Sequence, residues 1–162
     1  MQTLTQEALW QALATIPDPE IPVVSLVEMG IVREVTQTPT GEVTVTITPT
    51  FSGCPALEVM KTDILTRLKQ CGVPDVTVRT VLSPPWTTDW ITEAAREKLK
   101  SFGLAPPPHH GGDFAILLFD PVPCPYCDSQ NTTLKNNWGP TPCRMIFYCN
   151  QCQQPFEQFK PL

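Results

Sequence analysis

Apolar positions in the first hundred residues change their period several times, and each change marks a predicted element. The segment 5–15 is typical of an amphipathic helix, because its apolar residues recur at intervals of three and four on one face (Leu4, Ala8, Leu9, Ala12 and Leu13). Valine or isoleucine alternates with threonine over 43–48, which is the period of a half-buried strand. A strand that begins after Met29-Gly30 and runs through Val35 precedes it, and a turn at 38–41 joins the two strands into a hairpin.

A second helix is predicted after this hairpin. Pro55 suits the first position of a helix, the helix buries one apolar face (Leu57, Met60, Ile64 and Leu68), and Gly72 stands at its C-terminal cap. A third strand at 76–81 and a last helix at 88–102 follow. The order α-β-β-α-β-α therefore predicts an α+β fold in which three helices lie on one face of a small mixed sheet.

Proline and glycine divide the chain into parts. The segment 106–112 reads PPPHHGG and is predicted to be a linker, and the apolar run 114–119 after it predicts a short strand. We therefore expect an α+β domain at 1–105, a linker with a short strand at 106–122, and a C-terminal β module at 123–162.

Four cysteines in the C-terminal module form two Cys-x-x-Cys turns. Cys124 and Cys127 make the first turn, and Cys149 and Cys152 make the second, 21 residues further on. Two such turns facing each other supply four thiolates at the corners of a tetrahedron, which a structural Zn²⁺ prefers. Paired cysteine turns also hold iron, so the pattern predicts a zinc-ribbon-like module and leaves the metal open.

Further residues of this module have a simpler interpretation. Five aromatic residues are expected to form the small apolar shell that a ribbon needs around its metal (Trp138, Phe147, Tyr148, Phe156 and Phe159). Cys143 is a fifth thiol, for which packing is the plain explanation and ligand exchange during metal transfer the alternative.

Charge and composition exclude several classes of protein. The net charge is −5, with 11 basic residues and no two of them adjacent, so no basic face for nucleic acid is expected. The N-terminus has no secretion signal, and the longest apolar run is far shorter than the roughly 20 residues of a membrane helix. We therefore expect a soluble, cytoplasmic protein, in which seven cysteines indicate metal or thiol chemistry rather than disulfides.

Cys54 is the candidate for chemistry outside the ribbon. It lies between Gly53 and Pro55, at a predicted helix N-terminus where backbone N–H groups and the helix dipole stabilise a thiolate. A small buried cysteine is the alternative. Asp18 and Glu20 flank a proline and could bind a hard cation or help a thiolate to hold iron, although turn capping by Asp18 explains the pair more simply.

Two other pairs of residues have side chains that could serve a function. Trp86 and Trp90 flank a proline-stiffened loop, where aromatic side chains make good contacts with a partner protein, and a core role is the alternative. His109 and His110 are the only histidines and receive no functional role, because nothing predicted around them excludes water or orients a ring.

Several segments together resemble known families. The iron–sulfur assembly factor domain of cytosolic and Suf-type pathways is similar to three runs of this sequence (Asp18-Pro19-Glu20-Ile21-Pro22, Met29-Gly30-Ile31-Val32 and 48–55, which ends in Gly-Cys-Pro). Met29 replaces the leucine that is usual there. The D subunit family of the phenylacetyl-CoA epoxidase (oxygenase) system is similar to the rest of the chain (84–91, 103–107, the ribbon from Cys124 to Cys152, and 155–160).

The resemblance implies a non-catalytic accessory subunit of aerobic phenylacetate degradation. In that system a di-iron epoxidase oxidises phenylacetyl-CoA with electrons from a flavin and iron–sulfur reductase, and the D subunit helps to mature a metal centre of these partners. Cys54, with Asp18 and Glu20, would then handle iron or an iron–sulfur cluster transiently, and the ribbon would hold structural Zn²⁺.

The residues agree with a non-catalytic role. The sequence has no Glu-x-x-His pair of a di-iron bundle and no dinucleotide-binding fingerprint. The alternative hypothesis is an interaction module that binds the oxygenase or reductase subunits through Trp86 and Trp90 and transfers no metal. The sequence leaves open whether the chain is a homo-oligomer.

Overall fold

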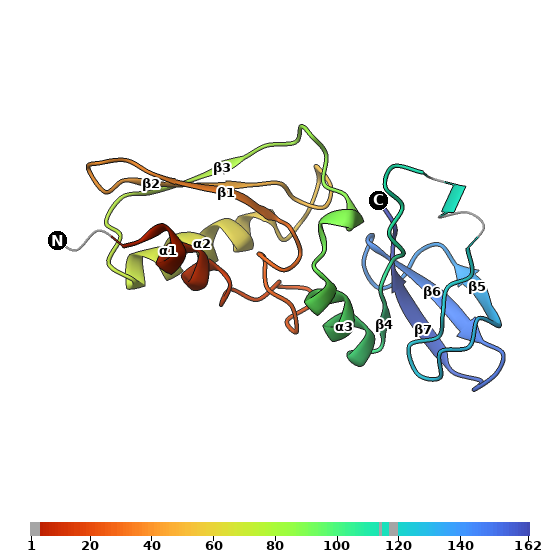
Figure 1. The fold of residues 1–162 in the computed structure, drawn as a ribbon. Coiled ribbons are helices and arrows are strands. Elements are labelled where there is room, and N and C mark those ends of the chain that lie inside the picture. The colour runs from red at the N-terminus through yellow and green to blue at the C-terminus, as the bar shows by residue number, and fades with distance from the viewer. Residues whose placement is uncertain (1–3, 114, 117–119) are drawn as a thin grey trace. The chain divides into compact units, whose positions relative to one another are not determined.

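The computed structural model describes residues 4–113, 115–116 and 120–162. The chain forms two compact units, Met1–Trp86 and Thr87–Leu162, and each unit contains its own β-sheet (Figure 1).

The first unit is built on a three-stranded mixed sheet in the order β1-β2-β3, with strands β1 (Val32–Gln37), β2 (Val43–Ile47) and β3 (Val76–Thr80). The central strand β2 is antiparallel to β1 and parallel to β3. Helix α2 (Leu57–Gln70) provides the crossover that two parallel neighbouring strands require. The mixed α+β architecture predicted from the sequence is thereby confirmed.

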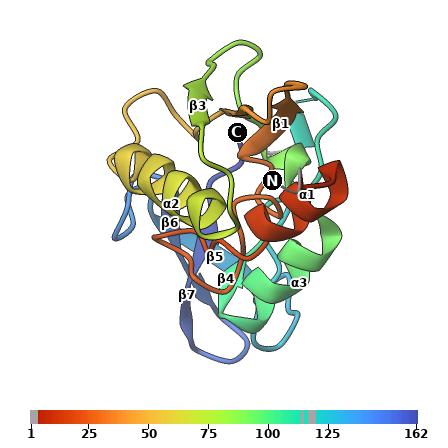
Figure 2. The ribbon, with the colours of Figure 1, turned by 90° about the vertical axis from the view of Figure 1, so that its left-hand side faces the viewer.

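Helices α1 (Gln6–Leu13) and α2 cover one face of this sheet (Figures 1 and 2). Thr5 caps α1 by accepting a hydrogen bond of 3.2 Å from the N–H of Ala8. Gly72, with φ of +89°, follows the end of α2 in the left-handed conformation that closes a helix. The predicted apolar positions meet in the core between helices and sheet (Leu9, Leu13, Val43, Val45, Ile47, Met60, Ile64 and Leu68, all buried).

The second unit contains a short 3-10 helix, η1 (Thr88–Trp90), helix α3 (Glu93–Ser101) and a four-stranded sheet in the order β4-β7-β6-β5. Its strands are β4 (Leu104–Ala105), β5 (Thr132–Asn136), β6 (Arg144–Cys149) and β7 (Pro155–Phe159). Strands β5, β6 and β7 form an antiparallel ribbon, and β4 adds to it parallel to β7.

Because β4 pairs with β7, the boundary between the two parts of the chain lies earlier than the sequence predicts. The sequence places 88–105 in the first domain, whereas in the structure these residues belong to the second compact unit. The physical reason is that β4 hydrogen-bonds to β7 of the ribbon and that α3 leads directly into β4. Only two of the three predicted helices therefore cover the sheet of the first unit.

The helix predicted at 88–102 is interrupted. Ile91 and Thr92 have extended backbones, with ψ of 127° and 156°. Thr92 begins α3 as its N-cap and accepts a hydrogen bond of 3.1 Å from the N–H of Ala95. The strand predicted at 114–119 lies largely outside the described residues.

The segment predicted to be a linker is held by hydrogen bonds. The buried side chain of Arg96 in α3 donates to the backbone oxygen of Pro107 and, over 2.7 Å, to that of Thr88. His110 is buried as well.

The longest described helix, α2, has 14 residues, and none of the helices that the structure describes has both the length and the apolarity needed to cross a membrane.

Candidate functional site

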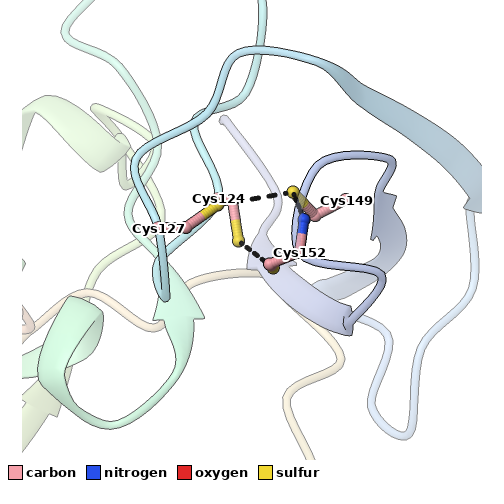
Figure 3. A group of neighbouring side chains, drawn as sticks. All are labelled: Cys124, Cys127, Cys149 and Cys152. Atoms are coloured by element: carbon pink, nitrogen blue, oxygen red, sulfur yellow. Dashed lines mark hydrogen bonds between the residues drawn. The ribbon is translucent and has the colours of Figure 1, made fainter.

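Four cysteine side chains converge in the second unit, as the sequence predicts (Figure 3). Cys124 and Cys127 lie in the turn that precedes β5, Cys149 ends β6, and Cys152 lies in the turn between β6 and β7. Three of these thiols are buried or half-buried, and Cys127 is exposed. The antiparallel pairing of β5 with β6 sets Thr132 opposite Cys149, which brings the two turns together.

The two cysteine turns have the same backbone design. In each, the N–H of the first cysteine donates to the carbonyl oxygen five residues later, over 2.9 Å from Cys124 to Ser129 and over 2.9 Å from Cys149 to Gln154. The residue after each second cysteine has a left-handed backbone, with φ of 59° in both turns (Asp128 and Gln153). The repeated geometry points both sulfurs of each turn to the same side.

The distances between the sulfurs fit one tetrahedral ion. The Sγ atoms of Cys124 and Cys152 are 3.7 Å apart and those of Cys127 and Cys149 are 3.6 Å apart, and all four lie within 4.8 Å of one another. Metal–sulfur bonds of about 2.3 Å at tetrahedral angles place sulfurs about 3.8 Å apart. The four thiols therefore have the arrangement of a closed site that suits one metal ion.

Without an ion, Cys149 and Cys152 differ strongly in acidity. The backbone N–H groups of Cys152 and Gln151 lower the pKa of Cys149 to about 6. Burial, helped by the neighbouring sulfurs, raises the pKa of Cys152 to about 12. Metal ligation requires thiolates, so binding an ion expels protons from this group and becomes stronger as the pH rises.

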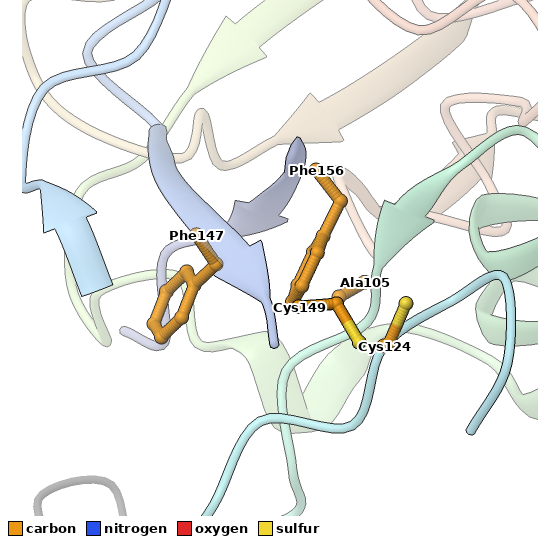
Figure 4. Close-up of a cluster of buried hydrophobic side chains, with 5 residues drawn as sticks. All are labelled: Ala105, Cys124, Phe147, Cys149 and Phe156. Atoms are coloured by element: carbon orange, nitrogen blue, oxygen red, sulfur yellow. The ribbon is translucent and has the colours of Figure 1, made fainter. Parts of the chain in front are cut away.

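An apolar cluster supports the metal site (Figure 4). The rings of Phe147 and Phe156 stack with centroids 5.7 Å apart and pack with Ala105 and the ligands Cys124 and Cys149. This confirms part of the predicted aromatic shell. Trp138 does not belong to it, because 67% of its surface is exposed.

Cys143 lies outside the group of four. It is buried, and its Sγ lies 3.1 Å from the hydroxyl of Thr141. Within the described part of the chain, no second group of three or more His, Cys, Asp or Glu side chains is close enough to share an ion.

Cys54 lies just before α2 in the first unit and is half-buried. Its N–H donates to Phe51 over 3.2 Å, and its carbonyl accepts from the N–H of Leu57 over 3.2 Å. The sequence pattern had placed Cys54 at the start of the helix. In the structure α2 begins three residues later, and Cys54 belongs to the turn that leads into it.

The turn with Asp18 and Glu20 is organised by Asp18. The Oδ1 atom of Asp18 accepts hydrogen bonds from the N–H groups of Glu20 over 2.8 Å and of Ile21 over 2.9 Å. This is the turn-capping role that the sequence indicates for Asp18. Glu20 therefore lies in a turn whose backbone is held by the side chain of Asp18.

In the structure, the charges of these two carboxylates act on the thiol of Cys54. Burial raises the pKa of the Cys54 thiol, N–H groups of Ala56 and Leu57 lower it, and the charges of Glu20 and Asp18 raise it further. The net effect is a raised pKa. The expectation that the helix start stabilises a thiolate is therefore wrong in sign for the metal-free protein, because burial and two nearby carboxylates outweigh the N–H groups.

The two tryptophans differ in their surroundings. Trp86 is 4% exposed, and its Nε1–H donates to the backbone oxygen of Met29 over 2.9 Å. This geometry favours the core role over a surface contact. Trp90 ends η1 and is half-buried.

The sequence does not predict the polar network that surrounds the two histidines. The carboxylate of Asp89 accepts hydrogen bonds from the N–H groups of His110 over 3.0 Å and of Gly111 over 2.8 Å. Although partial burial opposes them, these N–H groups lower the pKa of Asp89. His109 Nε2 lies 2.6 Å from Glu93 Oε1. Because the partners are 16 to 22 residues apart, no local pattern could have indicated the network, which ties the 106–112 segment to η1 and α3.

Comparisons with known proteins agree with this division into an α+β unit and a ribbon. The model of the iron–sulfur cluster assembly protein family matches residues 6–83, and that of the PaaD zinc beta ribbon domain matches residues 117–160. Among solved structures, a domain of unknown function from Bacillus anthracis is 28% identical, with a TM-score of 0.55 over 58% of this chain and 90% of its own. A conserved hypothetical protein from Thermotoga maritima is 29% identical, with a TM-score of 0.53 over 61% of this chain and 98% of its own. The class of protein is thus an iron–sulfur cluster assembly domain followed by a zinc ribbon.

Relatives narrow the class to one family. The D subunit of the 1,2-phenylacetyl-CoA epoxidase of Escherichia coli (strain K12) is 43% identical over 152 residues, which cover 94% of this chain and 90% of that protein. An Fe-S protein maturation auxiliary factor of Porphyromonas gingivalis is 33% identical over 96 residues, covering 59% of this chain and 90% of its own length. The chain belongs to the D subunit family of phenylacetyl-CoA epoxidases.

Proposed function

We propose that the protein is an accessory subunit of a phenylacetyl-CoA epoxidase system and delivers iron or an iron–sulfur cluster to metal centres of the oxygenase or reductase subunits. It performs no catalysis of its own in this proposal. The similarity to the D subunit of an epoxidase over almost the whole chain supports the place of action. The similarity of its first part to Fe-S protein maturation factors supports the kind of action.

The observation that carries the proposal is the pairing of Cys54 with the Asp18–Glu20 turn. Residues 34 or more positions apart in the sequence come near enough for the charges of two carboxylates to act on one half-buried thiol. Carboxylates near a thiol argue against a role as a nucleophile, because they disfavour the reactive thiolate. They suit a cation, whose positive charge reverses the local effect on the thiol pKa.

Cys54 then acts as a single exchangeable ligand. The ligand atoms of Cys54, Asp18 and Glu20 do not lie close enough together to form a closed set like that of the ribbon, so a cargo metal keeps open positions for ligands of the recipient. Asp18 holds the turn through its two backbone hydrogen bonds. Glu20 supplies negative charge beside the cargo, and the Cys54 thiol releases its proton when the metal binds.

The ribbon cysteines hold Zn²⁺ in this proposal. Four thiolates at tetrahedral spacing form a closed set that leaves no position for a substrate. The ion would join the two cysteine turns and thereby stabilise the β5-β6-β7 ribbon.

The experiment is metal analysis of protein purified without oxygen. Zinc, iron and acid-labile sulfide per chain are measured for the wild type, for Cys54→Ser and for the control Cys71→Ser. Cys71 is also half-buried and caps the other end of α2. We expect one zinc in all three proteins, and iron or sulfide that only Cys54→Ser loses.

Three outcomes would contradict the proposal. Iron that persists in Cys54→Ser, or partner subunits that acquire their metal normally in cells carrying this variant, would exclude Cys54 as the transfer ligand. Iron held only by the ribbon cysteines would refute the zinc assignment.

The second candidate is an interaction module that binds the oxygenase or reductase subunits and transfers no metal. Exposed aromatic side chains on the second unit favour it (Phe102, Tyr126 and Trp138), since such residues often dominate protein interfaces. Of the two tryptophans predicted as contacts, Trp90 keeps part of its surface exposed and Trp86 does not. One zinc per chain and no iron, even after cluster reconstitution, would favour this candidate.

A further inference from the structure

One face of the ribbon sheet carries a cavity that the metal site does not use. Side chains alternate along β6, so Met145 and Phe147 lie on one face and Ile146 on the other. On the face of Met145 and Phe147 a cavity of about 610 Å³ opens, and Leu134 and Gln158 also line it. Its volume is in the range of sites that enclose large organic groups.

A buried acceptor without a donor lies in this wall. Gln158 of β7 is 2% exposed, and its Oε1 atom is buried with no hydrogen-bond partner in the described part of the chain. A buried polar atom in this state is unfavourable until a donor reaches it. Together with the apolar lining, it indicates an occupant with an apolar body and one N–H or O–H group.

The chain itself presents such a group at the rim of the cavity. Trp138 is the most exposed of the large apolar side chains described, at 67%. The ammonium of Lys160 lies 4.2 Å from the centre of its ring, and Lys160 also lines the cavity. The indole ring therefore stands beside the cavity, and its Nε1–H is a donor only.

We propose that this face is a homodimer interface, in which the cavity of each copy receives Trp138 of the other. A two-fold axis makes every contact reciprocal, so one patch that contains both a tryptophan and a cavity is self-complementary. The rim also carries one base and one acid, Lys160 and Asp120, and a two-fold arrangement can set each opposite its counterpart. The two sheets then pack face to face at about 10 Å, as sheets do in sandwiches.

The inserted indole satisfies the orphaned acceptor. Its Nε1–H donates to Gln158 Oε1 of the second copy after a turn of the Gln158 amide towards the cavity. The partly exposed side chain of Leu134, with 45% of its surface accessible, becomes covered at the same time.

The test is sedimentation equilibrium of the full, metal-loaded chain over a range of concentrations. We expect a concentration-dependent dimer, with a dissociation constant that Trp138→Ala raises about thirty-fold or more, as for an interface hot spot. Phe102→Ala is the control, because Phe102 is 49% exposed on the same unit but does not line this cavity. Metal content and thermal melting of each variant show whether it is folded.

Gln158→Met separates the proposed contact from a general loss of apolar surface. It removes the unpaired acceptor, so the monomer is expected to melt no lower than the wild type, while the dimer weakens about five-fold or more because an indole N–H is buried unpaired. In the double variant with Trp138→Phe, the two effects should not add, since both remove the same hydrogen bond.

Each other outcome overturns the proposal. A chain that stays monomeric up to about 1 mM has a dimer dissociation constant above about 1 mM, which is too weak for a specific interface. A dimer that tolerates Trp138→Ala, or that Phe102→Ala weakens equally, is formed by another surface. Additive effects of Gln158→Met and Trp138→Phe would exclude the hydrogen bond.

Discussion

At Cys54, opposing influences set the acidity of one thiol. Two backbone N–H groups favour the thiolate, while burial and the carboxylates of Glu20 and Asp18 favour the protonated thiol. The protonated form prevails at neutral pH. A thiol of this kind resists alkylation and oxidation until a cation arrives, since the thiolate is the reactive form.

The contribution of Glu20 can be measured through thiol reactivity. Glu20→Gln removes a charge that raises the pKa of Cys54, so the pKa falls and more thiolate is present at pH 7. We expect Cys54 in metal-free protein to react faster with iodoacetamide near neutral pH, and its rate profile to move to lower pH. Mass spectrometry of the Cys54 peptide measures the rate.

Glu58→Gln is the matched control for this measurement. It removes the same charge from the first turn of α2, but Glu58 is not among the groups that shift the Cys54 pKa. An unchanged rate in Glu20→Gln, or an equal acceleration in Glu58→Gln, would show that the Asp18–Glu20 turn does not act on this thiol.

At the scale of elements, α3 shows how a cap can override a helical pattern. The apolar spacing over 88–102 predicts one helix, but Thr92 takes an extended backbone and caps α3 through Ala95. Ile91, the residue before it, is buried, which anchors the break. The short η1 before the break carries Asp89, whose hydrogen bonds hold the segment after β4.

This cap should make a measurable contribution to the free energy of unfolding. Thr92→Ala removes the acceptor for the Ala95 N–H, and we expect the free energy of unfolding of the second unit to fall by about 1 kcal/mol. Thr92→Ser keeps the hydroxyl and should lose at most a few tenths of that. Urea unfolding followed by circular dichroism measures both variants, and equal losses would show that the hydroxyl does not stabilise α3.

At the scale of the whole molecule, the chain comprises two units with different sources of stability. The first unit has a core of large aliphatic side chains between helices and sheet. The second has a small apolar cluster that includes two of the four metal ligands, Cys124 and Cys149. Small domains of this kind usually depend on their metal for folding.

Removal of the ribbon metal should therefore unfold one unit and spare the other. After treatment with a chelator, we expect amides of β5, β6, β7 and also α3 to lose protection from hydrogen exchange, while those of α1 and α2 keep theirs. Acid should act in the same direction, because the thiolate ligands take up protons as the pH falls. The measurement is hydrogen exchange with mass spectrometry at peptide resolution.

The helix α3 makes this prediction specific. Its place in the second unit rests on β4, which pairs with β7, and on the bonds of Arg96 within that unit. Protection of α3 that persists with α1 and α2 after metal removal would return 88–105 to the first domain, where the sequence places it.

Features governed by local spacing were predictable from the sequence. The period of apolar residues predicts α1, α2, β1, β2 and β3, because burial of one face imposes a period of 3.6 or 2 residues. The metal site was predictable for the same reason: the two cysteines of each turn are three residues apart, so the turn alone aims both sulfurs at one point.

Only the tertiary structure decided the features that depend on residues distant along the chain. It buried Trp86 against Met29 and placed α3 with the ribbon through β4. It also half-buried Cys54 within reach of the charges of Glu20 and Asp18, which reversed the expected direction of its pKa shift. Burial and charge act through space, where sequence spacing carries no information. The sequence by itself thus determined the elements, the four-cysteine ligand set and the family resemblance, while the fold determined which groups surround each functional atom.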